Sequence, residues 1–490
     1  MDKTTEANNT ASNTKRIAKN TLMLYFRQIL IMLVSLYTVR VVLNVLGAED
    51  YGIYNVVAGV VTMFSFLSGA MATASQRYFS FDLGKGDSEH LKTTFSVTFQ
   101  IYVLLAAIVI ILAETVGLWF VNHKLVIPEE RMTAANWIFQ AAIVSFLLTL
   151  ITTPYMASII AHENMNVYAY VSIVEAGLKL GIVFLLKILP FDKLIIYGIL
   201  LAVVALINTS IYRLYCHKHY AECKFRFVKD GRLFKEIVSY SGWNLFGSTA
   251  SVVHNQGMTI LINLFFGPLV NAARAVAAQV NVAVLSFAQN FSTALRPQII
   301  KFYATGDKES MLKMVMYGTK IIFFLMLMIC VPLYFQVPYL MQLWLKNVPD
   351  YTVLFVRLVV IDVLIDSISY PVMSVVQTKG KIKLYQGVVG GLLILNLPVS
   401  YIFLGLGFAP ESVFIVAIIL SVFAMIFRIL ITQKMVHFNL LLPFVKILLL
   451  FVVLTALSSL VPILIIKWFE NSQGKRHQGS RRVPDLSCKK

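Results

Sequence analysis

The sequence predicts an all-α integral membrane protein in which two six-helix bundles are related by an internal repeat, with one or two extra C-terminal helices. Three observations predict it. Hydrophobic residues make up 58% of the chain and charged residues 13%, against roughly 25% charged residues in soluble domains. Apolar stretches of membrane-spanning length recur along the chain, and ~20 residues are enough for a helix to cross the bilayer. Loop residues also repeat at a fixed interval, as in duplicated secondary transporters.

Glycines and acidic residues mark this repeat. Gly47 ends the first apolar stretch, and Gly267 ends the seventh, 220 positions later. The same shift relates three residues in one loop of each half: Gly86, Asp87 and Glu89 correspond to Gly306, Asp307 and Glu309. The matching hydropathy and loop residues therefore predict a duplicated bundle.

The elements follow in order. A cytoplasmic segment, 1–19, precedes an N-lobe, 20–212, and a basic loop, 213–236, leads to a C-lobe, 237–432. The N-lobe spans are expected at 29–46, 52–75, 97–119, 136–160, 168–186 and 194–212. The C-lobe spans are expected at 237–266, 271–293, 321–336, 353–376, 385–404 and 412–432. A thirteenth span, 447–466, lies in an additional segment, 433–469, and a polar basic tail, 470–490, follows it. Thirteen spans would place this tail outside, against its charge, so thirteen and fourteen spans both stay open.

The formal net charge of +18 would suggest nucleic acid as the partner of a soluble protein. Here Lys and Arg concentrate in alternate loops, above all in 213–235. The positive-inside rule then places these loops and the N-terminus in the cytoplasm. The basic excess therefore indicates topology, and we expect no nucleic-acid partner. Residues 1–14 contain no apolar stretch of a signal peptide, so the first span would direct insertion.

No motif for catalysis or for a cofactor is present. The sequence contains no Walker A loop, HExxH or GxSxG motif. Cys216 and Cys223 lie near two histidines, but their spacing fits no usual zinc site. We therefore expect a transporter without a metal or cofactor, and not an enzyme.

Arginines inside the spans predict an anion site. Arg27 and Arg40 lie in or beside the first span, and Arg274 lies in the eighth. A charged side chain within the bilayer costs on the order of 2.5–3.5 kcal/mol, so each arginine needs a partner or a watery cavity. Guanidinium groups that share a cavity would suit a diphosphate. A buried Arg–carboxylate pair or snorkelling to the interface is the alternative.

The seventh span is unusually polar, which is not typical of a lipid-facing helix. Asn244, Asn255 and Gln256 are among its polar residues. Such a helix should line a water-filled cavity, and we expect these amides to contact sugars.

Carboxylates within the spans are candidates for coupling to H⁺ or Na⁺. Asp362 and Asp366 lie four residues apart, on one face of the tenth span. Two ionised carboxylates on one face repel each other, which favours uptake of a cation. Pairing with Arg357 or with a neighbouring helix is the alternative. Glu175 is a third candidate, although Lys179, four residues later, would neutralise it.

One stretch resembles a known family. Leu46-Gly47, Tyr51-Gly52-Ile53-Tyr54, Gln76-Arg77-Tyr78-Phe79 and Gly84-Lys85-Gly86-Asp87 look like the opening of Wzx-type polysaccharide flippases. These proteins transport O-antigen and capsule repeats and belong to the multidrug/oligosaccharidyl-lipid/polysaccharide (MOP) exporter superfamily. The resemblance covers roughly 15–440. It implies two bundles that alternate between inward- and outward-open states, and an undecaprenyl-diphosphate-linked oligosaccharide whose head passes a cationic cavity. Related lipid II flippases carry cavity arginines on the first and eighth spans, where Arg27, Arg40 and Arg274 lie here.

The sequence therefore predicts an inner-membrane flippase of lipopolysaccharide or capsule biosynthesis. Its expected partners are the lipid-linked oligosaccharide, the bilayer, and a polysaccharide polymerase with chain-length proteins. A cation-coupled multidrug exporter of the same fold is one alternative, and it would favour carboxylates over arginines in the cavity. A membrane-embedded glycosyltransferase is the other, but it would need an acidic loop cluster, and none stands out.

Overall fold

The computed structural model describes residues 3–436 except 63, 124, 126, 346–347 and 380–381, and beyond these 449, 451, 453–455 and 457–458. The chain divides into two compact units. The first unit comprises 1–257, 286–318 and 370–398, and the second comprises the remaining residues. The predicted lobe boundaries follow the sequence repeat instead and stay a prediction. Most of the thirteenth predicted span and all of the basic tail lie outside the described residues.

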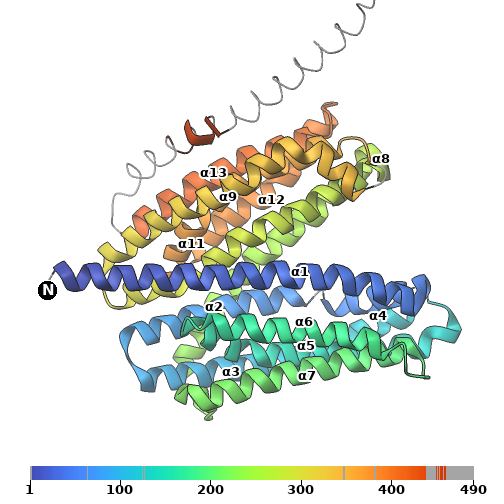
Figure 1. Cartoon of the computed structure of the whole chain (residues 1–490), viewed down its shortest axis with the longest axis horizontal. Helices are drawn as coiled ribbons and strands as arrows, with labels where there is room; N and C mark the ends of the chain where they lie inside the picture. The colour runs from blue at the N-terminus through green and yellow to red at the C-terminus, as the bar shows by residue number, and fades with distance from the viewer. Residues whose placement is uncertain are drawn as a thin grey trace, which may run out of the picture. The chain divides into compact units, whose positions relative to one another are not determined.

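The described residues form helices joined by short turns (Figure 1). The helices in the first 230 residues are α1 (Lys3–Thr62), α2 (Ser65–Lys85), α3 (Ser88–Leu112), α4 (Leu118–His123), α5 (Met132–Ala161), α6 (Met165–Leu185) and α7 (Lys193–His219), with short turns η1 (Ala113–Gly117), η2 (Glu129–Arg131) and η3 (Ala221–Cys223). The later helices are α8 (Gly231–Ala304), α9 (Lys308–Trp344), α10 (Thr352–Ser367), α11 (Ser369–Thr378), α12 (Lys383–Gly405) and α13 (Ser412–Val436). Within the described residues, nine helical segments are long and apolar enough to cross a membrane. The all-α membrane fold is thus confirmed.

Two glycines break the two longest helices at the positions that the repeat predicts. Gly47 interrupts α1 with φ 84° and ψ 168°, and Gly267 interrupts α8 with φ 77° and ψ −174°. Glycine adopts this conformation readily because it has no Cβ. Each long helix is therefore two helices joined at a glycine kink, and the two kinks are equivalent in the repeat.

The repeated loop residues Gly86 and Asp87 have the same backbone conformation and hydrogen bonding as their equivalents Gly306 and Asp307. Gly86 and Gly306 both have left-handed φ values, 73° and 81°. Asp87 accepts a hydrogen bond from the backbone N–H of His90 at 2.9 Å, and Asp307 accepts one from that of Ser310 at 3.0 Å. Each aspartate therefore caps the N-terminus of the next helix, α3 in one half and α9 in the other.

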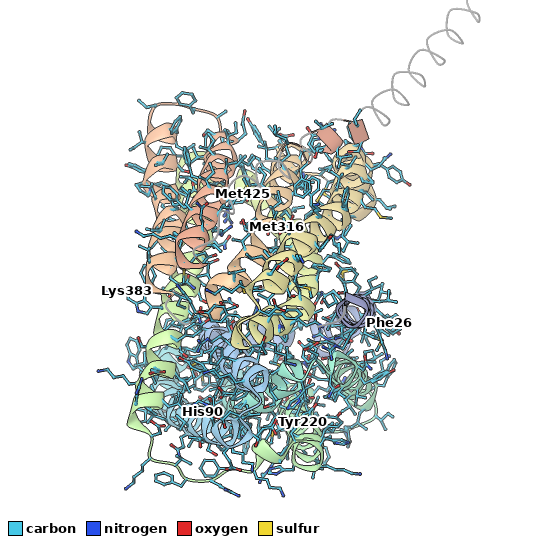
Figure 2. All side chains as sticks on the ribbon, turned by 90° about the vertical axis from the view of Figure 1, so that its left-hand side faces the viewer. Phe26, His90, Tyr220, Met316, Lys383 and Met425 are labelled. Atoms are coloured by element: carbon cyan, nitrogen blue, oxygen red, sulfur yellow. The ribbon has the colours of Figure 1, made fainter. Side chains whose placement is uncertain are left out.

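The outside of the molecule is apolar, as expected of a protein that faces lipid. In the first unit, α1 packs beside α6, and α5 packs beside α7 (Figure 1). Leu22 and Phe26 on α1 are 70% and 57% exposed, and many other large apolar side chains project from the ribbon (Figure 2). In the second unit α10 packs against α13, where the rings of Phe355 and Phe414 lie 4.5 Å apart. Exposed apolar helices of this length are suited to the bilayer, so the chain is a multi-pass membrane protein.

Within the first unit, α2 passes close to the end of α8. A Cβ added at Gly84 would lie 2.8 Å from Ala304 Cβ and 2.8 Å from Lys301 Cα. Gly84 and Ala304 are equivalent positions of the repeat. Equivalent positions of the two halves therefore face each other in the contact between α2 and α8.

Replacement of Gly84 by alanine is expected to destabilise the protein by about 1–3 kcal/mol, because the backbone of α8 must move to admit the methyl group. Thermal unfolding in detergent measures this loss. Gly69→Ala on the same helix is the matched control, because a Cβ there meets nothing within 4 Å, and alanine at a helical glycine is expected to stabilise by about 0.5–1 kcal/mol. Equal melting temperatures for the two variants would contradict close packing at Gly84.

Candidate functional site

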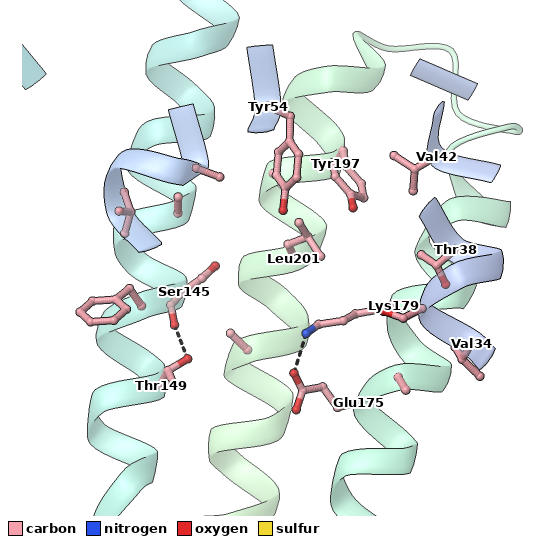
Figure 3. A pocket seen from close by; sticks show the side chains of 18 of the residues that line it. Val34, Thr38, Val42, Tyr54, Ser145, Thr149, Glu175, Lys179, Tyr197 and Leu201 are labelled. Carbon is pink, nitrogen blue, oxygen red and sulfur yellow. Dashed lines mark hydrogen bonds and ion pairs between the residues drawn. The ribbon is translucent and has the colours of Figure 1, made fainter. Parts of the chain in front are cut away.

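The first unit contains a cavity of about 590 Å³. It is bounded by α1, α5, α6 and α7 (Figure 3). Its wall combines tyrosines, hydroxyl groups and three charged side chains: Ser35, Thr38, Ser145, Thr149 and Ser172; Tyr51, Tyr54 and Tyr197; Arg27, Glu175 and Lys179. A volume of this size can accept a ligand as large as a small oligosaccharide.

The tyrosines at one end of the cavity come from the motif on which the family resemblance rests. Tyr51 and Tyr54 follow the kink at Gly47, so the break in α1 positions them. The rings of Tyr51 and Tyr54 stack at 6.4 Å. The ring of Tyr54 meets that of Tyr197 on α7 edge to face at 4.9 Å (Figure 3). Sequence reasoning did not predict this role for the tyrosines, and the signal that could have found them was the motif itself.

Glu175 and Lys179 form the intrahelical pair that their spacing allows. Lys179 Nζ lies 2.7 Å from Glu175 Oε1, as Figure 3 shows. Asn208 on α7 donates to the other carboxylate oxygen at 3.1 Å. Both oxygens of Glu175 are thus engaged at the cavity wall, where the three side chains offer a polar surface with little net charge. A coupling role for Glu175 stays a prediction.

Arg27 brings positive charge to the same cavity. Its guanidinium lies 4.5 Å from the ring centroid of Tyr168 on α6. Its Nε is buried and has no hydrogen-bond partner among the described residues. An arginine held by an aromatic face keeps its charge and its outer donors for a ligand.

The other two predicted arginines are described less fully. The structure describes Arg40 only as part of the α1 backbone, and its side chain is outside the description. Arg274 on α8 belongs to the second unit, where its Nη1 donates to Thr259 Oγ1 at 2.6 Å. A common cavity for the three arginines therefore stays a prediction.

The polar residues of the seventh span have different environments. Asn244 is buried, and its Oδ1 accepts from Gln386 Nε2 on α12 at 3.1 Å. Asn255 is exposed and donates to the Ser251 carbonyl at 3.0 Å. The side chain of Gln256 is outside the description. Asn244 thus joins two helices, whereas Asn255 is accessible to a ligand.

In the second unit the two aspartates of α10 differ in their partners. Arg428 on α13 pairs with Asp366 at 2.7 Å. Asp362 Oδ1 is buried and has no hydrogen-bond partner within the described residues. Arg357, the partner considered from sequence, instead donates to the Tyr334 carbonyl at 3.3 Å. The sequence analysis considered pairing with a neighbouring helix but did not name Arg428, although this arginine lies within the predicted span 412–432.

Comparison with solved structures identifies the fold. Over 87% of its length the chain matches 98% of the Vibrio cholerae MATE transporter VcmN in the bent form, with a TM-score of 0.68 and 17% identity. It also matches 96% of a MOP superfamily transporter from Pyrococcus furiosus over 86% of its length, with a TM-score of 0.72 and 13% identity. The chain therefore has the fold of the MOP transporters, as its sequence predicts.

Within this fold the sequence defines the family more narrowly. The chain belongs to the polysaccharide biosynthesis protein family, whose model matches residues 17–305. It is also 20% identical over 287 residues to EpsK of Bacillus subtilis (strain 168), described as an uncharacterized membrane protein. That match covers 58% of this chain and spans only 56% of EpsK. The family model includes all four helices around the cavity.

Proposed function

We propose that the protein is a flippase that moves an undecaprenyl-diphosphate-linked oligosaccharide from the cytoplasmic to the outer leaflet of the bacterial inner membrane. The observation that carries this proposal is the cavity in the first unit, built by the motif tyrosines of a polysaccharide biosynthesis family. Aromatic rings pack against the apolar faces of sugars, while hydroxyl, amide and carboxylate groups bind sugar hydroxyls. Tyr54 and Tyr197 supply rings and hydroxyl groups here, and Glu175 supplies a carboxylate.

The roles divide along the substrate. Arg27, with Arg40 and Arg274, would hold the diphosphate, because guanidinium groups bind phosphate oxygens in pairs. Sugars would occupy the tyrosine-lined cavity, and Asn255 and Gln256 would contact sugars farther along the path. Asn244 is the weakest candidate for sugar contact, because it is buried and hydrogen-bonded to Gln386.

An ion gradient of H⁺ or Na⁺ would drive the cycle through the aspartates of α10. Arg428 neutralises Asp366, so Asp362 is the carboxylate that would take up the cation. Rocking of the two lobes would expose the site alternately to each side, and a difference in binding between the two states would set direction. The N-terminus and the basic loop would lie in the cytoplasm. A polysaccharide polymerase and chain-length proteins would be partners of the flippase.

The experiment that tests this function is lipid analysis of a deletion strain. We expect the diphosphate-linked oligosaccharide to accumulate and surface polysaccharide to be lost. Wild type should rescue both, whereas Arg27→Gln should rescue less than a tenth of export at an equal membrane level, because it removes a positive charge that has no ion-pair partner among the described residues. Arg40→Gln and Arg274→Gln extend the test.

The matched control is Arg213→Gln, which makes the same change at an exposed arginine of α7. It should rescue fully. A multidrug exporter predicts the opposite pattern, in which the lipid intermediate is unchanged and drug sensitivity rises, and that result would refute the flippase proposal.

A further inference from the structure

A second cluster of charged residues lies in the first unit, outside the cavity. It is formed where α1, α2, the turn between α5 and α6, the last part of α8 and the end of α11 meet. We call it the basic junction and define it by Arg16, Arg77, Glu163, Arg296 and Lys301. Arg296 and Lys301 belong to the second half of the repeat and the others to the first. The proposed topology assigns this side to the cytoplasm.

Arg77 is a buried cation without a carboxylate partner. It is 8% exposed, and its Nε and Nη2 donate to the backbone carbonyls of Gln377 and Thr378 at 3.2 and 3.0 Å. The ring centroid of Tyr78 lies 4.3 Å from its guanidinium. The carbonyls at the end of α11 complement a positive charge only in part, because they carry fractions of a charge.

Arg296 is a second cation without a carboxylate partner in the described part of the chain, and it is partly buried. Its Nη1 donates to Gln76 Oε1 at 3.5 Å, and its Nε is buried and has no hydrogen-bond partner among the described residues. Positions 76 and 296 are equivalent in the repeat, 220 residues apart, so this contact joins equivalent residues of the two halves. Among the residues that the structure describes, no carboxylate is within salt-bridge distance of Arg77 or of Arg296.

The nearby carboxylates are already occupied. Glu163 is 1% exposed and pairs with Arg16 at 2.9 Å and with Lys301 at 2.8 Å. Its φ of 62° is left-handed, a strained conformation for a glutamate. Asp82 on α2 accepts from Thr94 at 2.6 Å and lies 3.0 Å from His90. Glu163 thus neutralises one of its two partners, and neither Arg77 nor Arg296 forms an ion pair within the part of the chain that the structure describes.

A buried guanidinium without a counter-charge is unfavourable, because arginine stays ionised and loses its hydration. Two such arginines on helices from both halves of the repeat indicate a site that an anion occupies in another state of the protein. Each guanidinium group can bind phosphate oxygens in a bidentate manner. Two such groups therefore match the charge and the hydrogen-bond acceptors of a diphosphate.

We propose that the basic junction is the docking site for the substrate diphosphate on its entry from the cytoplasm. The inference rests on the proposed function. In the state described here, backbone carbonyls and Gln76 occupy the donors of Arg77 and Arg296. When the halves part at this side, the diphosphate replaces these neutral partners. Because the anion binds this open state and not the closed one, its arrival favours opening toward the cytoplasm.

Arg296→Met tests the proposal with two readouts on the purified full-length protein. The first is the dissociation constant for farnesyl diphosphate, a short isoprenyl diphosphate, which we expect to rise at least tenfold. The second is the melting temperature without ligand, which we expect to rise, because the variant removes an uncompensated buried charge and leaves no carboxylate unpaired. Arg77→Met should weaken binding similarly, and Arg213→Met should change neither quantity.

Three results would overturn the proposal. A lower melting temperature with unchanged binding would make Arg296 a purely structural residue. Equal affinity for inorganic pyrophosphate and farnesyl diphosphate would show a site for free phosphates instead of a lipid headgroup. Full rescue of export by Arg296→Met in the deletion strain would refute the docking role alone. Absence of a lipid intermediate in that strain would instead refute the proposed function, whatever the binding result.

Discussion

Replacement of Tyr54 by alanine is expected to lower export of the lipid-linked oligosaccharide about tenfold. The Tyr54 ring is fixed between Tyr51 and Tyr197 and lines the cavity. An aromatic contact contributes about 0.5–1.5 kcal/mol beyond its buried area, and 1.4 kcal/mol corresponds to a factor of ten. The measurement is the rate at which newly made oligosaccharide appears at the cell surface, normalised to the membrane level of each variant.

Two controls separate ring contact from other effects. Tyr54→Phe keeps the ring and removes the hydroxyl, so it should retain most of the transport. Tyr170→Ala removes a tyrosine of α6 that is 61% exposed, and it should have no effect on export. If Tyr54→Ala and Tyr170→Ala behave alike, the cavity does not bind the sugar, and the proposed function loses the observation that carries it.

The duplicated architecture could be predicted from the sequence because its markers are local. Gly47 and Gly267 have a positive φ, a backbone conformation that other residues rarely adopt. The capping role of Asp87 and Asp307 depends only on the three residues that follow each of them. Features determined within a few residues are readable without knowledge of packing.

The site was less predictable because its contacts join residues that are distant along the chain. The motif tyrosines were recognised by resemblance, but nothing local to Tyr54 indicates that Tyr197 faces it. Likewise Arg77 is part of the recognised motif, whereas its partners Gln377 and Thr378 lie in the other half of the repeat. The rotation of each helix about its own axis decides such pairs, and packing fixes that rotation.

The pair formed by Asp366 and Arg428 also joins residues that are distant along the chain. Breaking it has the largest expected effect on stability. Their side chains are 34% and 13% exposed, and they connect α10 with α13 in the second unit. Arg428→Met would leave Asp366 without its counter-charge beside an apolar helix. Breaking a buried pair costs about 3–5 kcal/mol of the free energy of unfolding. Because Asp366 is partly exposed, we expect a loss at the lower end of this range, about 3 kcal/mol.

A double variant separates this structural role from ion coupling. Asp366→Leu with Arg428→Met removes both charges, so its melting temperature in detergent should return close to that of the wild type. Because Asp362 keeps its buried, unpartnered Oδ1, the double variant should also retain transport that depends on the ion gradient. Asp362→Asn should instead keep its stability and lose that dependence. The opposite result is a stable double variant that has lost its dependence on the ion gradient, together with an Asp362→Asn variant that keeps it. In that case Asp366 is the coupling carboxylate, and the cation binds by breaking its pair with Arg428.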